Sequence, residues 1–265
     1  MTGLLRSEMR KVFTTRLWWG LLIGVLLTSA GFAVLGGALV GLNPNGGAAT
    51  GPGLDDPAVV RSVYAAGISF GYLFALSFGI IAMSGEYRHQ TMTATVLASP
   101  HRFRVVLAKL LAVFGIGLGY GVCAVLAGLL GGIPVIMIRG GTLFLGSADT
   151  YRALALGAVA VALWAVLGLG VGTLIRNQVV ALLVAIGIAW IAEPLIGLAL
   201  NAADLGSIAQ YLPTQATTAL TSPPTTNGGF TTTLLPWWAG GLVLLGYAGV
   251  SGGLGAAITL RRDVT

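Results

Sequence analysis

Charged residues are scarce in this sequence: Asp, Glu, Lys and Arg make up 8% of its 265 residues. Soluble domains usually carry about 25% charged residues. A chain so poor in charge cannot cover a globule with polar surface, and 56% of its residues are apolar. The charges also gather between long apolar runs, as expected when charge avoids hydrocarbon. We therefore expect an all-α integral membrane protein, with residues 1–265 forming a single transmembrane domain.

The motifs of several enzyme classes are missing. Neither of the two lysines, Lys11 and Lys109, ends the phosphate-binding pattern G-x-x-x-x-G-K-[ST], so we expect no ATP hydrolysis by this chain. Residues 67–71 match the nucleophile pattern G-x-S-x-G, but they lie inside an apolar run, far from a histidine base. His89 and His101 have no cysteine near them. We expect no catalytic residue, no metal site and no cofactor bound by this chain.

Six apolar runs reach the roughly 20 residues that a membrane span requires. They cover residues 17–40, 59–83, 110–138, 153–175, 179–200 and 234–260. Residues 1–16 place apolar side chains on one helical face and basic ones elsewhere, which predicts an amphipathic interfacial helix with its basic face toward lipid headgroups. The polar segment 201–233 is expected outside the cell, as a re-entrant or helical segment before the last span.

The distribution of basic residues predicts the orientation. With six spans and both termini in the cytosol, 11 of the 14 basic residues lie inside and 3 lie outside. The inside set is Arg6, Arg10, Lys11, Arg16, Arg88, Arg102, Arg104, Lys109, Arg176, Arg261 and Arg262, and the outside set is Arg61, Arg139 and Arg152. We expect a multi-pass membrane protein with both termini in the cytosol, in contact with the membrane lipids.

Glycine is frequent, with 41 residues, and much of it occurs four residues apart. Such spacing lets helix backbones approach closely in membranes, where packing drives helix association. The pairs are Gly67/Gly71, Gly115/Gly119, Gly117/Gly121, Gly128/Gly132 and Gly168/Gly172. They predict tight helix contacts, either within the bundle or between protomers.

Glu193 is the one ionisable residue well inside a predicted span. A lone acid without an intramembrane partner is a weak basis for a proton or sodium relay. Two interpretations remain open. Glu193 marks a helix end or re-entrant bend near the outer interface, or it lines an exit path or a protomer interface.

The longest charged interval between spans is the loop at 84–104, which we expect in the cytosol. Met92, Val96 and Leu97 can form an apolar ridge on a short helix, with Arg88 and Arg102 on either side. Such a ridge suits a groove in a soluble partner, with the basic residues supplying orientation. The alternative is that these charges are only solvated and set the topology.

Glu86 is unusual in this loop, because an acid at a positive-inside border opposes the topological signal. We expect it to pair with Arg88 or Arg102 and so to fix the loop.

The stretch from Ser84 to Lys109 resembles the first cytosolic loop of ABC type 2 transporter permeases, which are the membrane subunits of bacterial exporters with a separate ATPase. The similar residues are 85–91 (GEYRHQT), 97–102 (LASPHR) and Lys109, while Gln90 stands where the family often has glycine. The resemblance implies that a short helix after Glu86 docks on the ATPase subunit. The implied docking and coupling residues are Glu86, Arg88, His89, Gln90, Thr91, Met92, Val96, Leu97, Pro100 and Arg102.

The resemblance further implies the permease subunit of an ATP-driven exporter in the bacterial cytoplasmic membrane, which moves a hydrophobic or amphipathic substrate across that membrane. ATP and Mg would bind the partner nucleotide-binding subunit, and a second copy or a sister permease would complete the path. No nucleic-acid partner is expected. The alternative is a non-transporting membrane adaptor or sensor subunit that recruits a soluble partner through residues 84–104. The segment 201–233 distinguishes the two. A permease should pack it as short helices that cap the path, whereas an adaptor could lose this segment without consequence.

Overall fold

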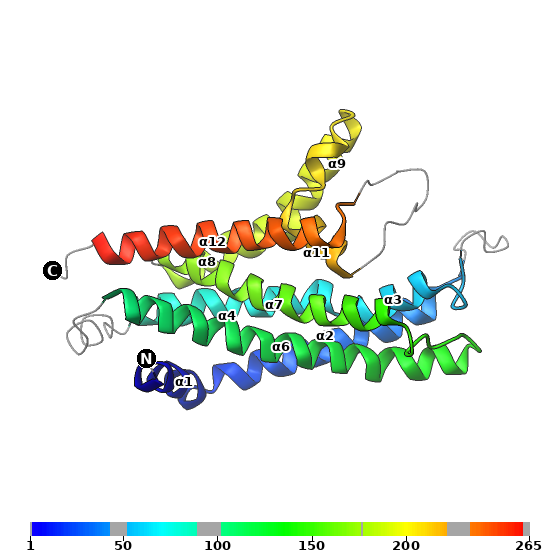
Figure 1. Ribbon diagram of the computed structural model, residues 1–265, viewed down its shortest axis with the longest axis horizontal. Coiled ribbons are helices and arrows are strands. Elements are labelled where there is room, and N and C mark those ends of the chain that lie inside the picture. Colours follow the sequence, from blue (N-terminus) through cyan, green and yellow to red (C-terminus); the bar gives the residue numbers. More distant parts are fainter. Residues whose placement is uncertain (1, 43–51, 89–101, 176, 222–233, 262–265) are drawn as a thin grey trace.

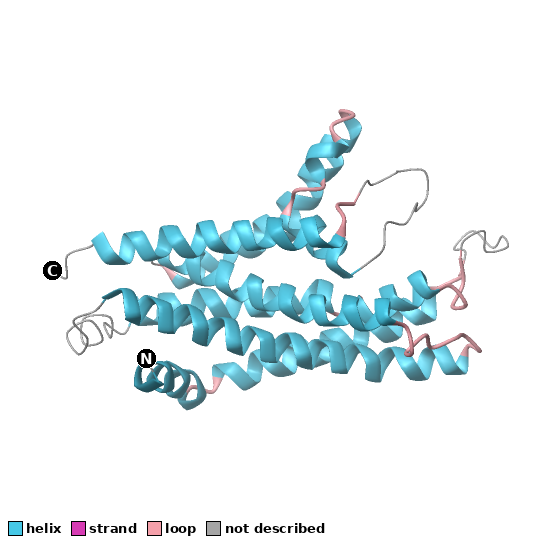
Figure 2. Cartoon of the chain, viewed as in Figure 1, coloured by secondary structure: helices cyan, strands magenta, loops and turns pink. Residues whose placement is uncertain are grey.

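The structure is a computed structural model that describes residues 2–42, 52–88, 102–175, 177–221 and 234–261. These residues form helices joined by loops, with no strand among them (Figure 2), and five helices are long and apolar enough to cross a membrane, by length and composition. This confirms the all-α prediction and fits a multi-pass membrane protein.

The helices follow the apolar runs of the sequence. α1 (Thr2–Thr14) precedes α2 (Leu17–Leu39), and α3 (Pro57–Ala65) and α4 (Ile68–Arg88) together form the second apolar stretch. α6 (Arg102–Ile138) and α7 (Ala148–Leu174) are the longest. Ser147 caps α7 by accepting a hydrogen bond from the Thr150 backbone N–H. The long helices lie side by side along the long axis of the molecule (Figure 1).

The fifth apolar stretch, Gln178–Ala202, is bent rather than straight. α8 (Gln178–Gly187) passes into a π-helical turn, η1 (Ile188–Ala192), and then into α9 (Glu193–Ala202), which leaves the bundle (Figure 1). The Glu193 N–H bonds to the carbonyl of Ile188, five residues back, and Pro194 has no N–H to donate. The irregular turn directly precedes Glu193, which agrees with the interpretation that Glu193 marks a helix bend.

α12 (Trp237–Arg261) occupies the position of the sixth predicted span and packs beside α7. It is not among the five candidate spans, and seven of its 25 residues are glycine. Before α12, the segment predicted at 201–233 contains two short helices, α10 (Gly206–Ala209) and α11 (Pro213–Thr221). Residues 222–233 lie outside the described residues.

α7 is the central helix and packs against α4, α6 and α12. Trp164 on α7 is 2% exposed, stacks on Tyr72, and donates its indole N–H to the Thr217 hydroxyl at 2.9 Å. The indole therefore has a buried polar partner on α11.

Glycine sets the distances between these helices. A Cβ atom on Gly168 or Gly172 would run into the backbone of α4, one on Gly117 or Gly121 into the backbone of α7, and one on Gly128 into the carbonyl of Tyr64. The prediction of tight contacts within the bundle is confirmed for the pairs on these faces. Gly115 and Gly119 differ, because a Cβ there meets no atom within 4 Å in the described chain.

Arg139 was counted above only as a charge that sets the topology. It also caps the C-terminus of α2. Its Nη1 donates to the carbonyls of Gly37, Ala38 and Val40 at 3.0, 2.9 and 2.6 Å. The last carbonyls of a helix lack intrahelical donors, and a guanidinium supplies them.

Candidate functional site

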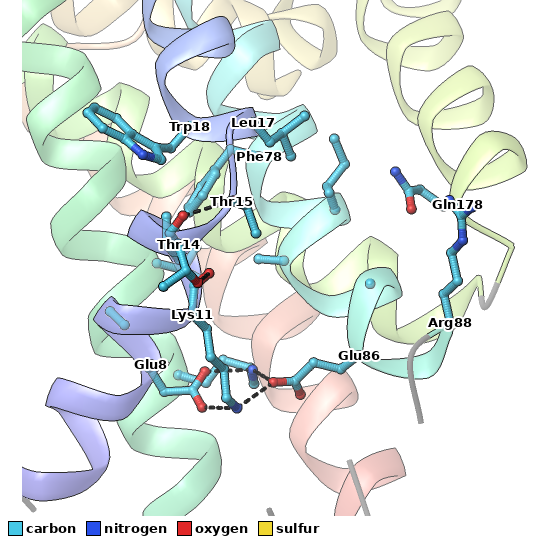
Figure 3. A pocket seen from close by; sticks show the side chains of 17 residues that line it. Glu8, Lys11, Thr14, Thr15, Leu17, Trp18, Phe78, Glu86, Arg88 and Gln178 are labelled. Atoms are coloured by element: carbon cyan, nitrogen blue, oxygen red, sulfur yellow. Dashed lines mark hydrogen bonds and ion pairs between the residues drawn. The ribbon is translucent and has the colours of Figure 1, made fainter. Parts of the chain in front are cut away.

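Four charged side chains meet at the end of the bundle beside α1 (Figure 3). We call Glu8, Lys11, Glu86 and Lys109 the charge cluster. Lys11 Nζ lies 2.6 Å from Glu8 Oε1 and 2.9 Å from Glu86 Oε1, and Lys109 Nζ lies 2.7 Å from Glu8 Oε2 and 2.6 Å from Glu86 Oε1. Each lysine thus bridges the same two glutamates.

Most of the charge cluster is buried. Glu8, Glu86 and Lys109 are each 6% exposed, whereas the Lys11 side chain is 39% exposed. The cluster holds both lysines of the chain and two of its three glutamates. Buried charges are tolerated only when they are paired, and removal of one partner is costly. The cluster is therefore a neutral unit that holds together the three helices that supply it.

Local sequence explains the positions. Glu8 and Lys11 are three residues apart on α1 and so lie on the same side of that helix. Glu86 stands in the last turn of α4, and Lys109 lies about two turns into α6. Met9 and Val12 of α1 pack against the hydrophobic core and turn Glu8 toward the bundle.

The ion pairs change the proton affinities of both α1 residues. Burial alone would raise the pKa of Glu8, but the charges of Lys109 and Lys11 and their hydrogen bonds outweigh it, so this pKa is lowered. Burial would lower the pKa of Lys11, but hydrogen bonds to Glu8 and Glu86 and their charges raise it. Both shifts favour the charged forms.

These shifts predict how stability depends on pH. A lowered Glu8 pKa gives stability that is present above its ordinary value of 4.5 and is lost as pH falls through the folded pKa. A raised Lys11 pKa gives stability that is present below 10.5 and is lost as pH rises through the folded pKa. We expect the melting temperature of the detergent-purified protein to be flat between about pH 5 and pH 10 and to fall on either side. A steep change near neutral pH would contradict this expectation.

A pocket of about 480 Å³ adjoins the charge cluster. α1, α2, α4 and α6 contribute to its lining, together with Gln178 at the start of α8 (Figure 3). Glu86 lines it, and Glu86 Oε2 has no hydrogen-bond partner among the described residues. Leaving a buried acceptor unpaired costs about 1–3 kcal/mol, and more when it is charged. This oxygen is the one unsatisfied buried side-chain atom in the described chain.

The structure corrects the expected partner of Glu86. Arg88 is exposed and does not pair with Glu86, whose partners are Lys11 and Lys109. Two residues along a helix correspond to about 200° of rotation, so Arg88 points away from the buried side of α4. The Arg102 backbone begins α6, but its side chain is outside the described part.

Seven predicted docking residues lie outside the described residues, so the structure says nothing about their contacts. They are His89, Gln90, Thr91, Met92, Val96, Leu97 and Pro100. The structure places the residues on either side of them, Arg88 and Arg102, at the ends of α4 and α6.

The sequence analysis did not identify Glu8 as a site residue, and its prediction for the environment of Lys11 was wrong. Lys11 was assigned to a basic face toward lipid headgroups, yet its ammonium lies between two glutamates. One signal was available for Glu8. On a helical wheel it falls between Leu4 and Val12, inside the apolar face of α1, where an acid is unfavourable unless it is paired.

Glu193 also has a partner, which its sequence context did not reveal. It is 5% exposed, and its Oε2 accepts hydrogen bonds from the Thr214 backbone N–H at 2.9 Å and the Thr214 hydroxyl at 2.7 Å. Thr214 is the second residue of α11, so Glu193 caps the N-terminus of that helix from a distant segment. Its position at the bend of Gln178–Ala202 agrees with the interpretation of a helix bend.

No family model matches this chain, and no curated protein sequence matches it either.

Proposed function

We propose that this chain is the membrane permease subunit of an ATP-driven exporter of the ABC type 2 class, working with an ATPase on a separate chain. The observation that carries the proposal is the position of the charge cluster. It joins α1 to the end of α4 and the beginning of α6, the two helices between which the loop at 89–101 runs.

In this proposal, a subunit docked on that loop would act on two helix ends, of α4 and α6, that the charge cluster holds together. Glu86 lies in the last turn of α4 and Lys109 about two turns into α6, and their contact of 2.6 Å would couple the movements of the two helix ends. Glu8 adds α1 to the same unit through its contact with Lys109. A force on the loop would therefore reach the bundle through α4 and α6 jointly, as ATP-driven switching between two states requires.

The segment before α12 favours a permease over an adaptor. α10 and α11 are short helices, and α11 packs on α12 and α7. Glu193 and Trp164 both make hydrogen bonds to threonines of α11. A segment held by hydrogen bonds to two buried residues, Glu193 and Trp164, is an integral part of the bundle, whereas an adaptor would not require it.

Co-purification tests the proposal. The tagged full-length protein is purified from its native membranes in mild detergent, and the eluate is assayed for ATPase activity. We expect a soluble ATPase to co-purify and to be lost when residues 89–97 are replaced by a Gly/Ser linker. The matched control replaces residues 43–51, which are also nine in number and follow α2 in the sequence, and it should leave the ATPase bound. The C-terminal end of α2 lies at the opposite end of the bundle from the C-terminal end of α4 (Figure 1). An eluate without ATPase activity, or one that keeps it in both variants, would refute the proposal.

A further inference from the structure

α1 presents three different faces around its axis. Glu8 and Lys11 lie on the face toward the bundle, where both belong to the charge cluster (Figure 3). Leu5 and Phe13 lie on a second face that points outward, and they are 38% and 52% exposed. Arg6 and Arg10 are also exposed and form a third face beside the apolar one. We call the second and third faces together the outer face of α1.

The two arginines of the outer face have no counter-ion in the described part of the chain. Neither Arg6 nor Arg10 takes part in an ion pair there, and Glu8 and Glu86 are already bound by the lysines. Arg6 and Arg10 are one helical turn apart, which places their Cβ atoms about 5–6 Å from each other. Two guanidinium groups at that spacing can donate to one phosphate group. The outer face therefore suits a partner that carries phosphate.

The position of α1 indicates that this partner is the membrane. Only Thr15 and Arg16 separate α1 from α2, the first candidate span. The long helices extend along the molecule in Figure 1, whereas α1 is seen nearly end-on, so α1 runs across them. The Phe13 ring packs against Trp18 at the start of α2, with a centroid distance of 5.2 Å, and tryptophan is enriched at the level of lipid headgroups. A helix that lies in this plane places its apolar face among acyl chains and its basic face at the phosphates.

We propose that the outer face of α1 binds anionic phospholipids, such as phosphatidylglycerol. The phosphate accepts hydrogen bonds from Arg6 and Arg10, and the acyl chains pack against Leu5 and Phe13. The net charge of the lipid gives the selectivity, because a zwitterionic lipid carries its own cation beside the phosphate. α1 is then held on one side by the charge cluster and on the other side by lipid. This inference does not depend on the transport function, since the lipid contacts α1 whether or not an ATPase is bound.

Two lipids with the same acyl chains test the proposal. The full-length protein in mild non-ionic detergent is mixed with equal amounts of phosphatidylglycerol and phosphatidylcholine, and the first lipid bound is identified by native mass spectrometry. Each basic residue near an anionic membrane surface favours binding about fivefold, so two arginines predict a preference of about 25-fold for phosphatidylglycerol. Equal binding of the two lipids would overturn the proposal.

Two double variants decide whether the preference belongs to α1. Arg6→Gln combined with Arg10→Gln removes both donors of the outer face and should lower the preference about tenfold or more. Arg88→Gln combined with Arg104→Gln removes two exposed cations from α4 and α6 instead, and it should leave the preference nearly unchanged. All four side chains are exposed, so both variants should fold. An equal loss in the two variants would show that the preference reflects the total charge of this end of the bundle, and would overturn the assignment to α1.

Two further measurements exclude other partners. Glycerol phosphate in large excess should not displace the bound phosphatidylglycerol, because it lacks the acyl chains that contact Leu5 and Phe13. The variant with Gln at positions 6 and 10 is also purified from native membranes, and its eluate is assayed for ATPase activity. Displacement by glycerol phosphate would assign the arginines to a soluble phosphate, and loss of the ATPase with an unchanged lipid preference would assign them to a soluble subunit. Either result would overturn the proposal.

Discussion

Gly168→Leu should prevent α4 and α7 from packing and leave little monodisperse protein after extraction from the membrane. A Cβ at Gly168 would run into the carbonyl group and Cα of Leu76, which are backbone atoms that cannot rotate away. Gly79 of α4 is in the same position against the carbonyl of Ala165, so the two helices touch through glycines from both sides. Overpacking costs about 1–3 kcal/mol when side chains can adjust, and we expect at least the upper end here.

The measurement is the melting temperature of the monodisperse fraction by fluorescence-detected size-exclusion chromatography. Gly115→Leu is the matched control, because it makes the same change inside α6 where no atom lies within 4 Å of the added Cβ. It should change stability by about 0.5 kcal/mol or less. Equal melting of the Gly168 and Gly115 variants would show that the α4–α7 contact does not limit the stability of the bundle.

Lys109→Met should destabilise the protein by about 3–5 kcal/mol, the cost of removing one partner from a buried ion pair. Glu8 and Glu86 would then share Lys11, which is the more exposed of the two lysines. The added methionine fills the volume, so the effect isolates the charge. We expect a large drop in the thermal midpoint and in the yield from the membrane fraction.

A second substitution should restore much of this loss. Lys109→Met combined with Glu8→Gln removes one charge of each sign and leaves the Lys11–Glu86 pair, whose atoms lie 2.9 Å apart. The coupling between the two changes is obtained from a double-mutant cycle. Arg104→Met provides the control, because Arg104 is an exposed cation five residues earlier on α6. If the Lys109→Met and Arg104→Met variants have the same melting temperature, the charge cluster does not stabilise the bundle.

The sequence contained the information for most helix boundaries. α2 at Leu17–Leu39 and α7 at Ala148–Leu174 closely match the runs predicted at 17–40 and 153–175, because a membrane span depends only on a sustained run of apolar side chains. The bend before Glu193 has a similarly local cause, since Pro194 lacks the N–H that a regular helix needs.

Tertiary structure alone decided which of these residues meet. Apolar runs in α6 and α7 are apolar all round, so composition could not distinguish Gly117, which packs against α7, from Gly115, which does not. The charge cluster is likewise invisible to local reasoning, because Lys109 contacts Glu8 across 101 residues of sequence. The nearest charge along the chain was therefore a poor guide to the partner of Glu86. Pairing of buried charges follows from which helix ends share one low-dielectric site, and that is a property of the packed bundle.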